Sequence, residues 1–401
     1  MLIRASKILT MSGSTLSDAA VRIVDNTIQE IDHDLQPLPN EEVIDLGGHV
    51  LLPGLINAHC HLDYTGFKGS IFRGKGFTEW IKKINSIKLS YTPEDYLASI
   101  QTGFSMLMDS GCTTVLNIES FPDLLLKMNP PPIRTWWFLE LMDLRSRLGQ
   151  EDSLMGALTF FQGQPGWLGG FGLSPHAPYT SSIELYRLAK HCSEMLDLPI
   201  TTHIAESIEE QEMFLYGEGP MFEFLKGIGR DMQDCGQGSA LSHLLDFGLL
   251  NGKCLTVHMN YLQNYDFQAL ERNPLNVVHC PGCHAYFAHA RFPMERLLEM
   301  KCNISLGTDS LASNDTLDLR KEIRRARFEY PQYTAEEWLR MVTTAPAKAL
   351  GREGLLGVIK PQALADLVAF PLPDGMEPHE AVIQSTVEPS FFMVNGVRLN
   401  S

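Results

Sequence analysis

Short apolar runs that end in a polar residue recur through the middle of the chain. Stretches with helical periodicity lie between them, for example at 94–109, 183–197, 290–300 and 334–350. Near-continuous apolar strands separated by helices are typical of a parallel sheet, and eight such units predict a (β/α)8 TIM-like barrel of the α/β class, with a doubly wound open sheet as the alternative. The eight runs are "LINAHCH", "CTTVLNIE", "RTWWFLEL", "GFGLSPH", "PITTHIAE", "CLTVHMN", "NVVHCPG" and "NISLGTDS".

The two ends of the chain have a different pattern. The first fifty residues contain β-branched runs such as "AAVRIVDNTIQEID", which Asn, Gly and Pro interrupt, and the last forty contain "ADLVAFPL" and "FFMVNGVRLN". In the second of these, Asn395-Gly396 is a strong signal for a hairpin turn. The pattern predicts a small β-sandwich domain made of residues 1–53 and 351–401, which flanks a barrel at 54–350.

Polar residues gather where the predicted barrel strands end. In a barrel of parallel strands these ends converge on one face, where the active sites of this fold are built. One histidine at such a position is more often a satisfied core residue than a ligand, but so many strand ends with His or Asp indicate a site. The residues are His59 and His61, Asn117 or Glu119, Glu140, His176, His203 with Glu206, His258, His279 and Asp309.

The stretch "HCH" at 59–61 indicates a metal site. Side chains alternate along a strand, so His59 and His61 point to the same side and can reach one ion. Imidazole nitrogens suit zinc or iron, and a third histidine with a carboxylate completes a catalytic site. His203 and Asp309 are the candidates for these positions, and Cys60 between the two histidines is expected to point into packing. We expect one divalent metal ion per chain, zinc in the first place, with iron or manganese as alternatives.

The stretch "HCPGCH" at 279–284 suggests other chemistry. Cys280, Cys283 and His284 match the motif of covalent c-type haem attachment, and the two cysteines could also form a redox dithiol or half of a structural zinc site. No second C-x-x-C or H-x-x-H supplies the missing zinc ligands. We therefore interpret both cysteines as small buried hydrophobic residues, and a haem or dithiol redox protein is the remote alternative.

Composition and charge narrow the class of protein. The chain has 401 residues, 44% hydrophobic content and a formal net charge of −16, which disfavours nucleic acid and anionic membranes as partners. The N-terminal stretch "MLIRASKILTMSGS" resembles no targeting signal, and no apolar run has the length of a membrane span. These features predict a cytoplasmic enzyme with a small-molecule substrate, for which a homodimer is an open alternative.

The motifs "PGLINAHCH", "SPHAPYT", "TTHIAES" and "LGTDSLASND" resemble those of the amidohydrolase superfamily, in particular its branch of nucleobase deaminases and chlorohydrolases. The resemblance covers nearly the whole chain and implies a metal held by His59, His61, His203 and Asp309. It also implies that His258 orients the attacking water and that Glu206 transfers protons. The implied reaction is hydrolytic deamination of a cyclic amidine, in which Asp309 accepts the proton of the water.

Within that branch, "VVHCPGCHAYFAH" and "LGTDSLASNDTLDL" are similar to enzymes that deaminate 6-amino-6-deoxyfutalosine on the menaquinone route, although those relatives tend to have Arg-Ser where this chain has Gly282-Cys283. This nucleoside is the favoured substrate, and S-adenosylhomocysteine, guanine, cytosine and s-triazines are alternatives. We expect His176 and His279 to contact the substrate ring or ribose and Arg145 or Arg147 to pair with a carboxylate. The stretch 207–250 is expected to cover the mouth of the barrel.

Overall fold

The computed structural model describes residues 1–74, 76–144, 154–157, 159–160, 164 and 166–399. Eight parallel strands form the sheet of a barrel in the order β12-β11-β10-β9-β8-β7-β6-β5, which is the order of the chain. All eight predicted runs form these strands. Their bounds are β5 Leu55–Cys60, β6 Cys112–Glu119, β7 Arg134–Leu141, β8 Gly169–Pro175, β9 Ile200–Ile204, β10 Cys254–His258, β11 Asn276–His279 and β12 Asn303–Leu306.

The two edges of this sheet meet just beyond the ends of β12 and β5. The backbone N–H of Thr308 donates to the carbonyl of His59 at 3.0 Å, and Cys60 and Asp309 form a parallel bridge. The approach is close enough that a Cβ on Gly307 would lie 2.9 Å from His59, so the contact requires glycine at this position. The closure brings the residues after β12 beside the histidines of β5.

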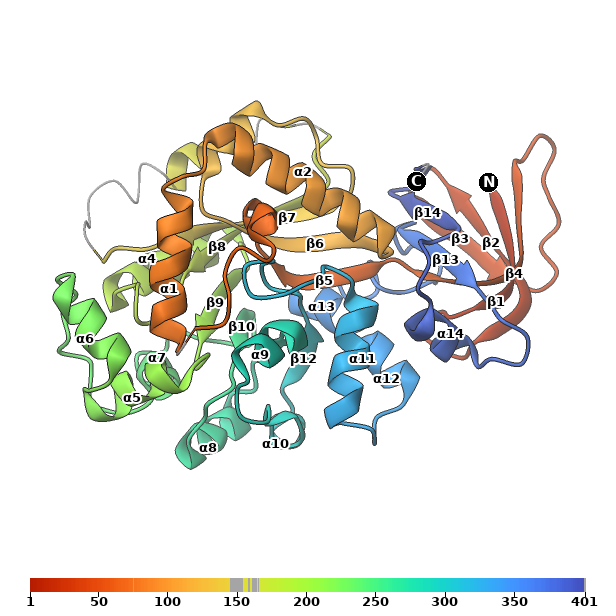
Figure 1. Cartoon of the computed structure of the whole chain (residues 1–401). Helices are drawn as coiled ribbons and strands as arrows, with labels where there is room; N and C mark the ends of the chain where they lie inside the picture. The colour runs from red at the N-terminus through yellow and green to blue at the C-terminus, as the bar shows by residue number, and fades with distance from the viewer. Residues whose placement is uncertain (75, 145–153, 158, 161–163, 165, 400–401) are drawn as a thin grey trace.

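The chain ends form a second sheet beside the barrel (Figure 1). Its seven strands have the order β15-β14-β13-β4-β1-β2-β3, and all pairs are antiparallel except β1 with β4. Residues 395 and 396, between β14 and β15, have φ angles of 53° and 76°, which confirms the hairpin turn. The bounds are β1 Leu2–Ile8, β2 Leu16–Val24, β3 Thr27–Asp32, β4 Val43–Pro53, β13 Leu367–Pro371, β14 Phe391–Val394 and β15 Val397–Arg398.

Helices follow the barrel strands, and several of them begin at polar caps. Thr92 and Asp95 form a capping box at the start of α2 (Pro93–Asp109), and Ser182 and Ser207 cap α4 (Ile183–Leu196) and α5 (Ile208–Tyr216). The other helices are α1 Phe77–Lys88, α6 Pro220–Gly227, α7 Ala240–Asp246, α8 Asn264–Arg272, α9 Pro281–Phe287, α10 Met294–Glu299, α11 Leu319–Glu329, α12 Ala335–Arg340, α13 Thr344–Ala349 and α14 Pro378–Gln384, with short 3-10 turns at Leu62–Phe67 and Pro122–Lys127. No helix of the described residues is both long enough and apolar enough to cross a membrane.

An apolar cluster fills the inside of the barrel. Its members come from alternate positions of the strands, as expected when inward-facing side chains stack in layers. Cys280 and Cys283 are 1% and 0% exposed and belong to this cluster. The other members include Ile56, Ala58, Leu116, Ile118, Trp136, Phe138, Leu255, Val257 and Val278.

Candidate metal centre

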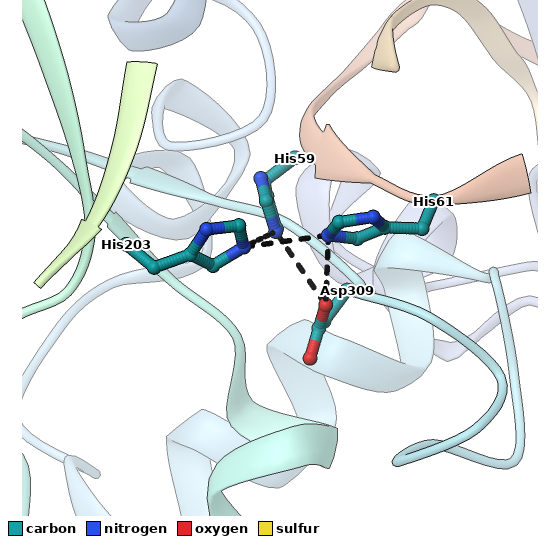
Figure 2. A group of neighbouring side chains, drawn as sticks. All are labelled: His59, His61, His203 and Asp309. Carbon is teal, nitrogen blue, oxygen red and sulfur yellow. Dashed lines mark hydrogen bonds and ion pairs between the residues drawn. The ribbon is translucent and has the colours of Figure 1, made fainter. Parts of the chain in front are cut away.

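Four buried side chains meet at the carboxyl end of the barrel, and we call them the metal-binding group: His59, His61, His203 and Asp309 (Figure 2). The Nε2 atom of His203 lies 3.2 Å from Nε2 of His59 and 3.3 Å from Nε2 of His61. Oδ1 of Asp309 lies 3.4 Å from Nε2 of His59 and 3.7 Å from Nε2 of His61. Three imidazole nitrogens and one carboxylate oxygen therefore face a common point.

Burial sets the charges of this group. It lowers the pKa of His61 to about 3 and the pKa of His203 well below its ordinary value, so these imidazoles are neutral at physiological pH. Burial alone would raise the pKa of Asp309, but the interactions with His59 and His61 outweigh it and hold that pKa well below its usual range. Neutral imidazoles beside an ionised carboxylate are the protonation states that a metal ion requires.

Hydrogen bonds to neighbouring residues orient the ligands. Nδ1 of His203 donates to the carbonyl of His176 at 2.8 Å, which turns the lone pair of Nε2 toward the metal-binding group. Oδ2 of Asp309 accepts a hydrogen bond from Ser313 at 2.9 Å, so Oδ1 is left to face the histidines. Asp309 and His258 have φ angles of 56° and 77°, a region that non-glycine residues rarely adopt. Strained backbone held at such positions is typical of functional sites.

The donor set fits a divalent metal ion. Three nitrogens and one carboxylate oxygen are the ligands of catalytic zinc and related ions, and the donor atoms lie within 4.8 Å of one another. Among the described residues, only His59 and His61 form ion pairs with Asp309, and no Lys or Arg does so. The arrangement is a binding site for one divalent metal ion.

Glu206 and His258 lie next to the metal-binding group without belonging to it. Oε1 of Glu206 is 3.6 Å from Nε2 of His258. Burial raises the pKa of Glu206 well above its ordinary value and lowers that of His258 to about 3. Glu210 fixes the turn after β9, because its carboxylate accepts the backbone N–H groups of Ala205 at 3.0 Å and Glu206 at 2.7 Å. The site thus combines a carboxyl group whose raised pKa favours the protonated form, a neutral imidazole and an ionised aspartate.

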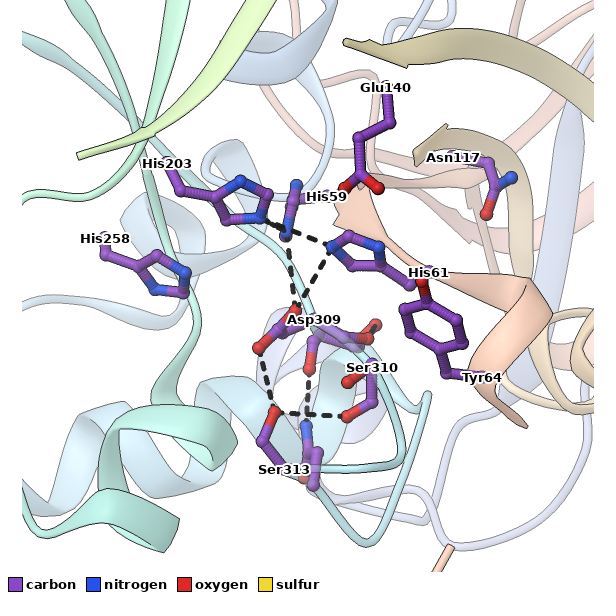
Figure 3. Close-up of polar contacts among 12 residues, drawn as sticks. His59, His61, Tyr64, Asn117, Glu140, His203, His258, Asp309, Ser310 and Ser313 are labelled. Carbon is purple, nitrogen blue, oxygen red and sulfur yellow. Dashed lines mark hydrogen bonds and ion pairs between the residues drawn. The ribbon is translucent and has the colours of Figure 1, made fainter. Parts of the chain in front are cut away.

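A cavity of about 780 Å³, which we call the chamber, opens from the metal-binding group. Glu140 and His258 lie beside the group at its inner end (Figure 3). Farther out the walls come mainly from α1 and α6 and are largely apolar, and Lys88 is the only Lys or Arg among the described residues that line the chamber. The apolar wall residues are Phe77, Trp80, Ile81, Ile84, Leu89, Phe121, Met142, Leu144, Met221, Phe224, Leu225 and Ile228.

Not every predicted substrate contact lies at the chamber. His176 lines it, and its Nε2 is 3.9 Å from Oε1 of Glu140. His279 differs from the prediction, because its buried ring stacks on Phe292 with a centroid distance of 4.0 Å and does not line the chamber. Arg145 and Arg147 lie outside the described residues.

The cysteines of "HCPGCH" lie in the interior of the barrel. Their burial excludes the thiols from solvent and leaves no access for covalent haem attachment. Both are free thiols. The structure therefore supports their interpretation as buried packing residues.

Sequence reasoning missed the contribution of α1 to the chamber. Trp80 and Lys88 line the chamber from this helix, and Nζ of Lys88 lies 4.3 Å from the centroid of the Tyr64 ring, which stacks on His61 at 5.6 Å. The stretch "FTEWIKKINSIK" reads as an ordinary amphipathic helix. Nothing in its pattern distinguishes a helix that covers a site from one that covers the core.

The barrel, the metal-binding group and the adjacent acid define a metal-dependent hydrolase. The model of the Amidohydrolase family matches residues 50–399. The chain therefore belongs to the amidohydrolase family, as its motifs indicated.

Named relatives are similar along nearly the whole chain. A 5-methylthioadenosine/S-adenosylhomocysteine deaminase from Pyrococcus furiosus is 29% identical over 93% of this chain and 86% of its own. The crystal structure of Helicobacter pylori aminofutalosine deaminase in complex with methylthio-coformycin superposes with a TM-score of 0.86 at 22% identity and covers 100% of both chains. That of an adenosine deaminase from Xanthomonas campestris with bound zinc has a TM-score of 0.82 at 21% identity and covers 99% of this chain and 92% of that one. The two structures share the fold of this chain.

Proposed function

We propose that the protein is a metal-dependent hydrolytic deaminase of 6-aminopurine nucleosides. The observation that carries the proposal is the opposite shift of two carboxyl pKa values at one end of the chamber. Burial raises the pKa of Glu206 and so favours its protonated form, whereas the neighbouring histidines lower the pKa of Asp309 and favour its ionised form, and both residues line the chamber. Two carboxyl groups whose environments separate their pKa values mark the acid and the base of a reaction. The deaminase names of the relatives support the same reaction.

The residues divide the proton transfers among themselves. A divalent ion held by the metal-binding group would lower the pKa of a water molecule to about 7 and so would make hydroxide available at neutral pH. Glu206 protonates the ring nitrogen next to the amino-bearing carbon, which makes that carbon accept attack. Asp309 accepts the proton of the attacking water, and the neutral imidazole of His258 holds this water by a hydrogen bond. Asp309 passes this proton to the amino group, which leaves as ammonia. The hydroxyl group at the attacked carbon returns its proton to Glu206 as the ring becomes a hypoxanthine.

The inner wall offers partners for a ribose. The side chain of Glu140 is only 3% exposed, and its Oε2 accepts a hydrogen bond from Ser120 at 2.6 Å. Nδ1 of His176 forms a hydrogen bond with the hydroxyl group of Thr180 at 2.6 Å. The other ring nitrogen, Nε2, is therefore available to a substrate in the chamber. A carboxylate acceptor and an imidazole at this position suit the two hydroxyl groups of a ribose.

The outer chamber favours a large, mostly apolar 5′ extension with one negative charge. Aromatic and aliphatic side chains surround a volume that a free nucleobase would not fill, and Lys88 supplies a positive charge. An aromatic carboxylate satisfies both features. The homocysteine of S-adenosylhomocysteine would also place an ammonium against these apolar walls, at a cost in desolvation. We therefore propose 6-amino-6-deoxyfutalosine as the substrate that fits best.

A deamination screen tests the proposal. The rate of loss of the adenine chromophore would be compared for 6-amino-6-deoxyfutalosine, 5′-methylthioadenosine, S-adenosylhomocysteine, 5′-deoxyadenosine and adenosine. Guanine, cytosine and a chlorinated triazine serve as controls. We expect the highest kcat/KM for the nucleoside with the benzoate extension. Faster turnover of a free base or of the triazine than of every adenine nucleoside would refute the proposal.

A further inference from the structure

A second set of metal donors lies beside the metal-binding group and shares no residue with it. Donor atoms of Glu206, His258 and Cys283 all lie within 4.8 Å of one another, and the three residues are 5%, 3% and 0% exposed. Glu206 lies in the turn after β9, His258 is the last residue of β10 and Cys283 lies in the first turn of α9, so three separate segments at the end of the barrel contribute one donor each. A thiol, an imidazole and a carboxylate are together a donor set for zinc and other thiophilic ions.

One donor of this set lacks any hydrogen-bond partner in the described part of the chain, and another would exchange a hydrogen bond for the ion. Nε2 of His258 is buried without a hydrogen-bond partner among the described residues. Oε1 of Glu206 is 3.6 Å away from this nitrogen, which is too long for a hydrogen bond. Glu206 and His258 both line the chamber, so an ion that enters the chamber reaches these two donors directly. The thiol of Cys283 does not line the chamber; it lies near Glu206 and forms a hydrogen bond with Asp309, which the ion would replace.

We propose that Glu206, His258 and Cys283 form a second, weaker site for a thiophilic divalent cation such as zinc or cadmium, and that the occupied site inhibits the enzyme. The second ion binds more weakly than the first because two divalent cations a few ångströms apart repel each other. Binding displaces the protons of Cys283 and Glu206 to solvent. A Glu206 that coordinates the ion cannot protonate a substrate, and the ion occupies the inner end of the chamber. The inhibition rests on the proposed role of Glu206, whereas the binding does not.

Hard cations bind poorly to this set of donors. Magnesium and calcium prefer an all-oxygen environment, and here oxygen comes only from Glu206. We therefore expect inhibition by zinc and cadmium at concentrations where magnesium and calcium have no effect. This selectivity distinguishes a thiol-containing site from a general effect of ionic strength on the acidic chain.

The test compares two buried cysteines at the start of α9. Cys283→Ser and Cys283→Ala remove the thiol from the donor set, and Cys280→Ser is the matched control, because Cys280 is 1% exposed in the same cluster but is not one of the three donors. Each protein is prepared with one equivalent of zinc and then titrated with zinc or cadmium. Initial rates give the inhibition constant, and calorimetry counts the second equivalent. Near-ultraviolet absorption after addition of cadmium or cobalt reports a thiolate ligand directly, without any reference to activity.

We expect a second equivalent to bind to the wild-type protein, with a thiolate charge-transfer band and loss of activity that a chelator reverses. Cys283→Ser should weaken the inhibition constant at least tenfold, or about 1.4 kcal/mol, abolish the band and leave the rate at one equivalent within about twofold. Cys280→Ser should behave as the wild type.

Equal inhibition of the wild type and Cys283→Ser, or a wild-type protein that binds no second equivalent and shows no band, would overturn the proposal. If neither Cys283 variant folds, the presence or absence of the thiolate charge-transfer band in the wild-type protein decides whether the site exists. If a second equivalent binds and produces the thiolate band but the rate is unchanged, the site exists and the proposed role of Glu206 is refuted.

Discussion

Replacement of Glu206 by Gln separates proton transfer from metal binding. The amide keeps the size of the side chain and can donate an N–H, but it cannot give up a proton at neutral pH. The backbone contacts of this residue do not depend on the side chain: its N–H donates to Glu210 at 2.7 Å, and its carbonyl accepts from Asn260 at 2.9 Å. The variant should therefore fold as the wild type does and keep the geometry of the turn after β9.

The expected loss follows from the role of the acid. General acid–base catalysis contributes about 10²- to 10⁴-fold, so kcat of Glu206→Gln should fall by this factor, which corresponds to about 2.7–5.5 kcal/mol in the activation free energy. Metal content should stay at the wild-type value, because Glu206 is not in the metal-binding group. Glu212→Gln, farther along the same helix α5, is the matched control and should change neither quantity.

The dependence of kcat on pH provides the second readout. Burial raises the pKa of Glu206, so the protonated, active form is present below that raised pKa and is lost as the pH rises through it. The wild-type rate should therefore decline on the alkaline side, and the residual rate of Glu206→Gln should lack that decline. Rates follow from the adenine chromophore and metal content from elemental analysis. A Glu206→Gln protein without metal would place this residue among the ligands, and one with full activity would refute its role as the acid.

Three further predictions test the ligands, the chamber and the link between the two sheets. His61→Ala should lose the metal and all measurable turnover, as elemental analysis of the purified variant would show; retention of one equivalent would exclude His61 as a ligand. Lys88→Met should raise KM for a carboxylate-bearing nucleoside about tenfold, the low end for a charged hydrogen bond, and leave KM for 5′-methylthioadenosine within about twofold. Arg134 and Asp366 form a buried ion pair with N–O distances of 2.8 and 3.1 Å, so urea denaturation of Asp366→Ala should show a loss of about 3–5 kcal/mol. The double replacement Arg134→Met with Asp366→Leu should recover most of that loss, and an equal loss in both proteins would refute the role assigned to the unpaired buried charge.

The barrel could be predicted from the sequence because each strand is an apolar run that ends in a polar residue. The same feature predicted the metal-binding group, since strand order and the alternation of His59 with His61 place the side chains without knowledge of the loops. The predicted domain boundaries, 53/54 and 350/351, remain a prediction. His279 shows the limit of the rule: it ends β11, yet its ring turns onto Phe292. Which way a terminal side chain turns depends on what packs against it, and the sequence pattern does not contain that information.

The chamber illustrates the same limit on a larger scale. Its walls come mainly from α1 and α6, which are distant in sequence but pack against each other. The ammonium of Lys88 lies over the ring of Tyr64, a contact that the sequence pattern does not indicate. The residues of the metal-binding group lie at the ends of strands, whereas the outer wall residues proposed to receive the 5′ extension lie mainly on helices whose positions follow from tertiary packing. The reaction could thus be inferred from the motifs alone, and the substrate could not. A variant such as Lys88→Met, which changes the wall and leaves the strands intact, should accordingly alter which nucleoside is preferred without altering metal content or the pH dependence of kcat.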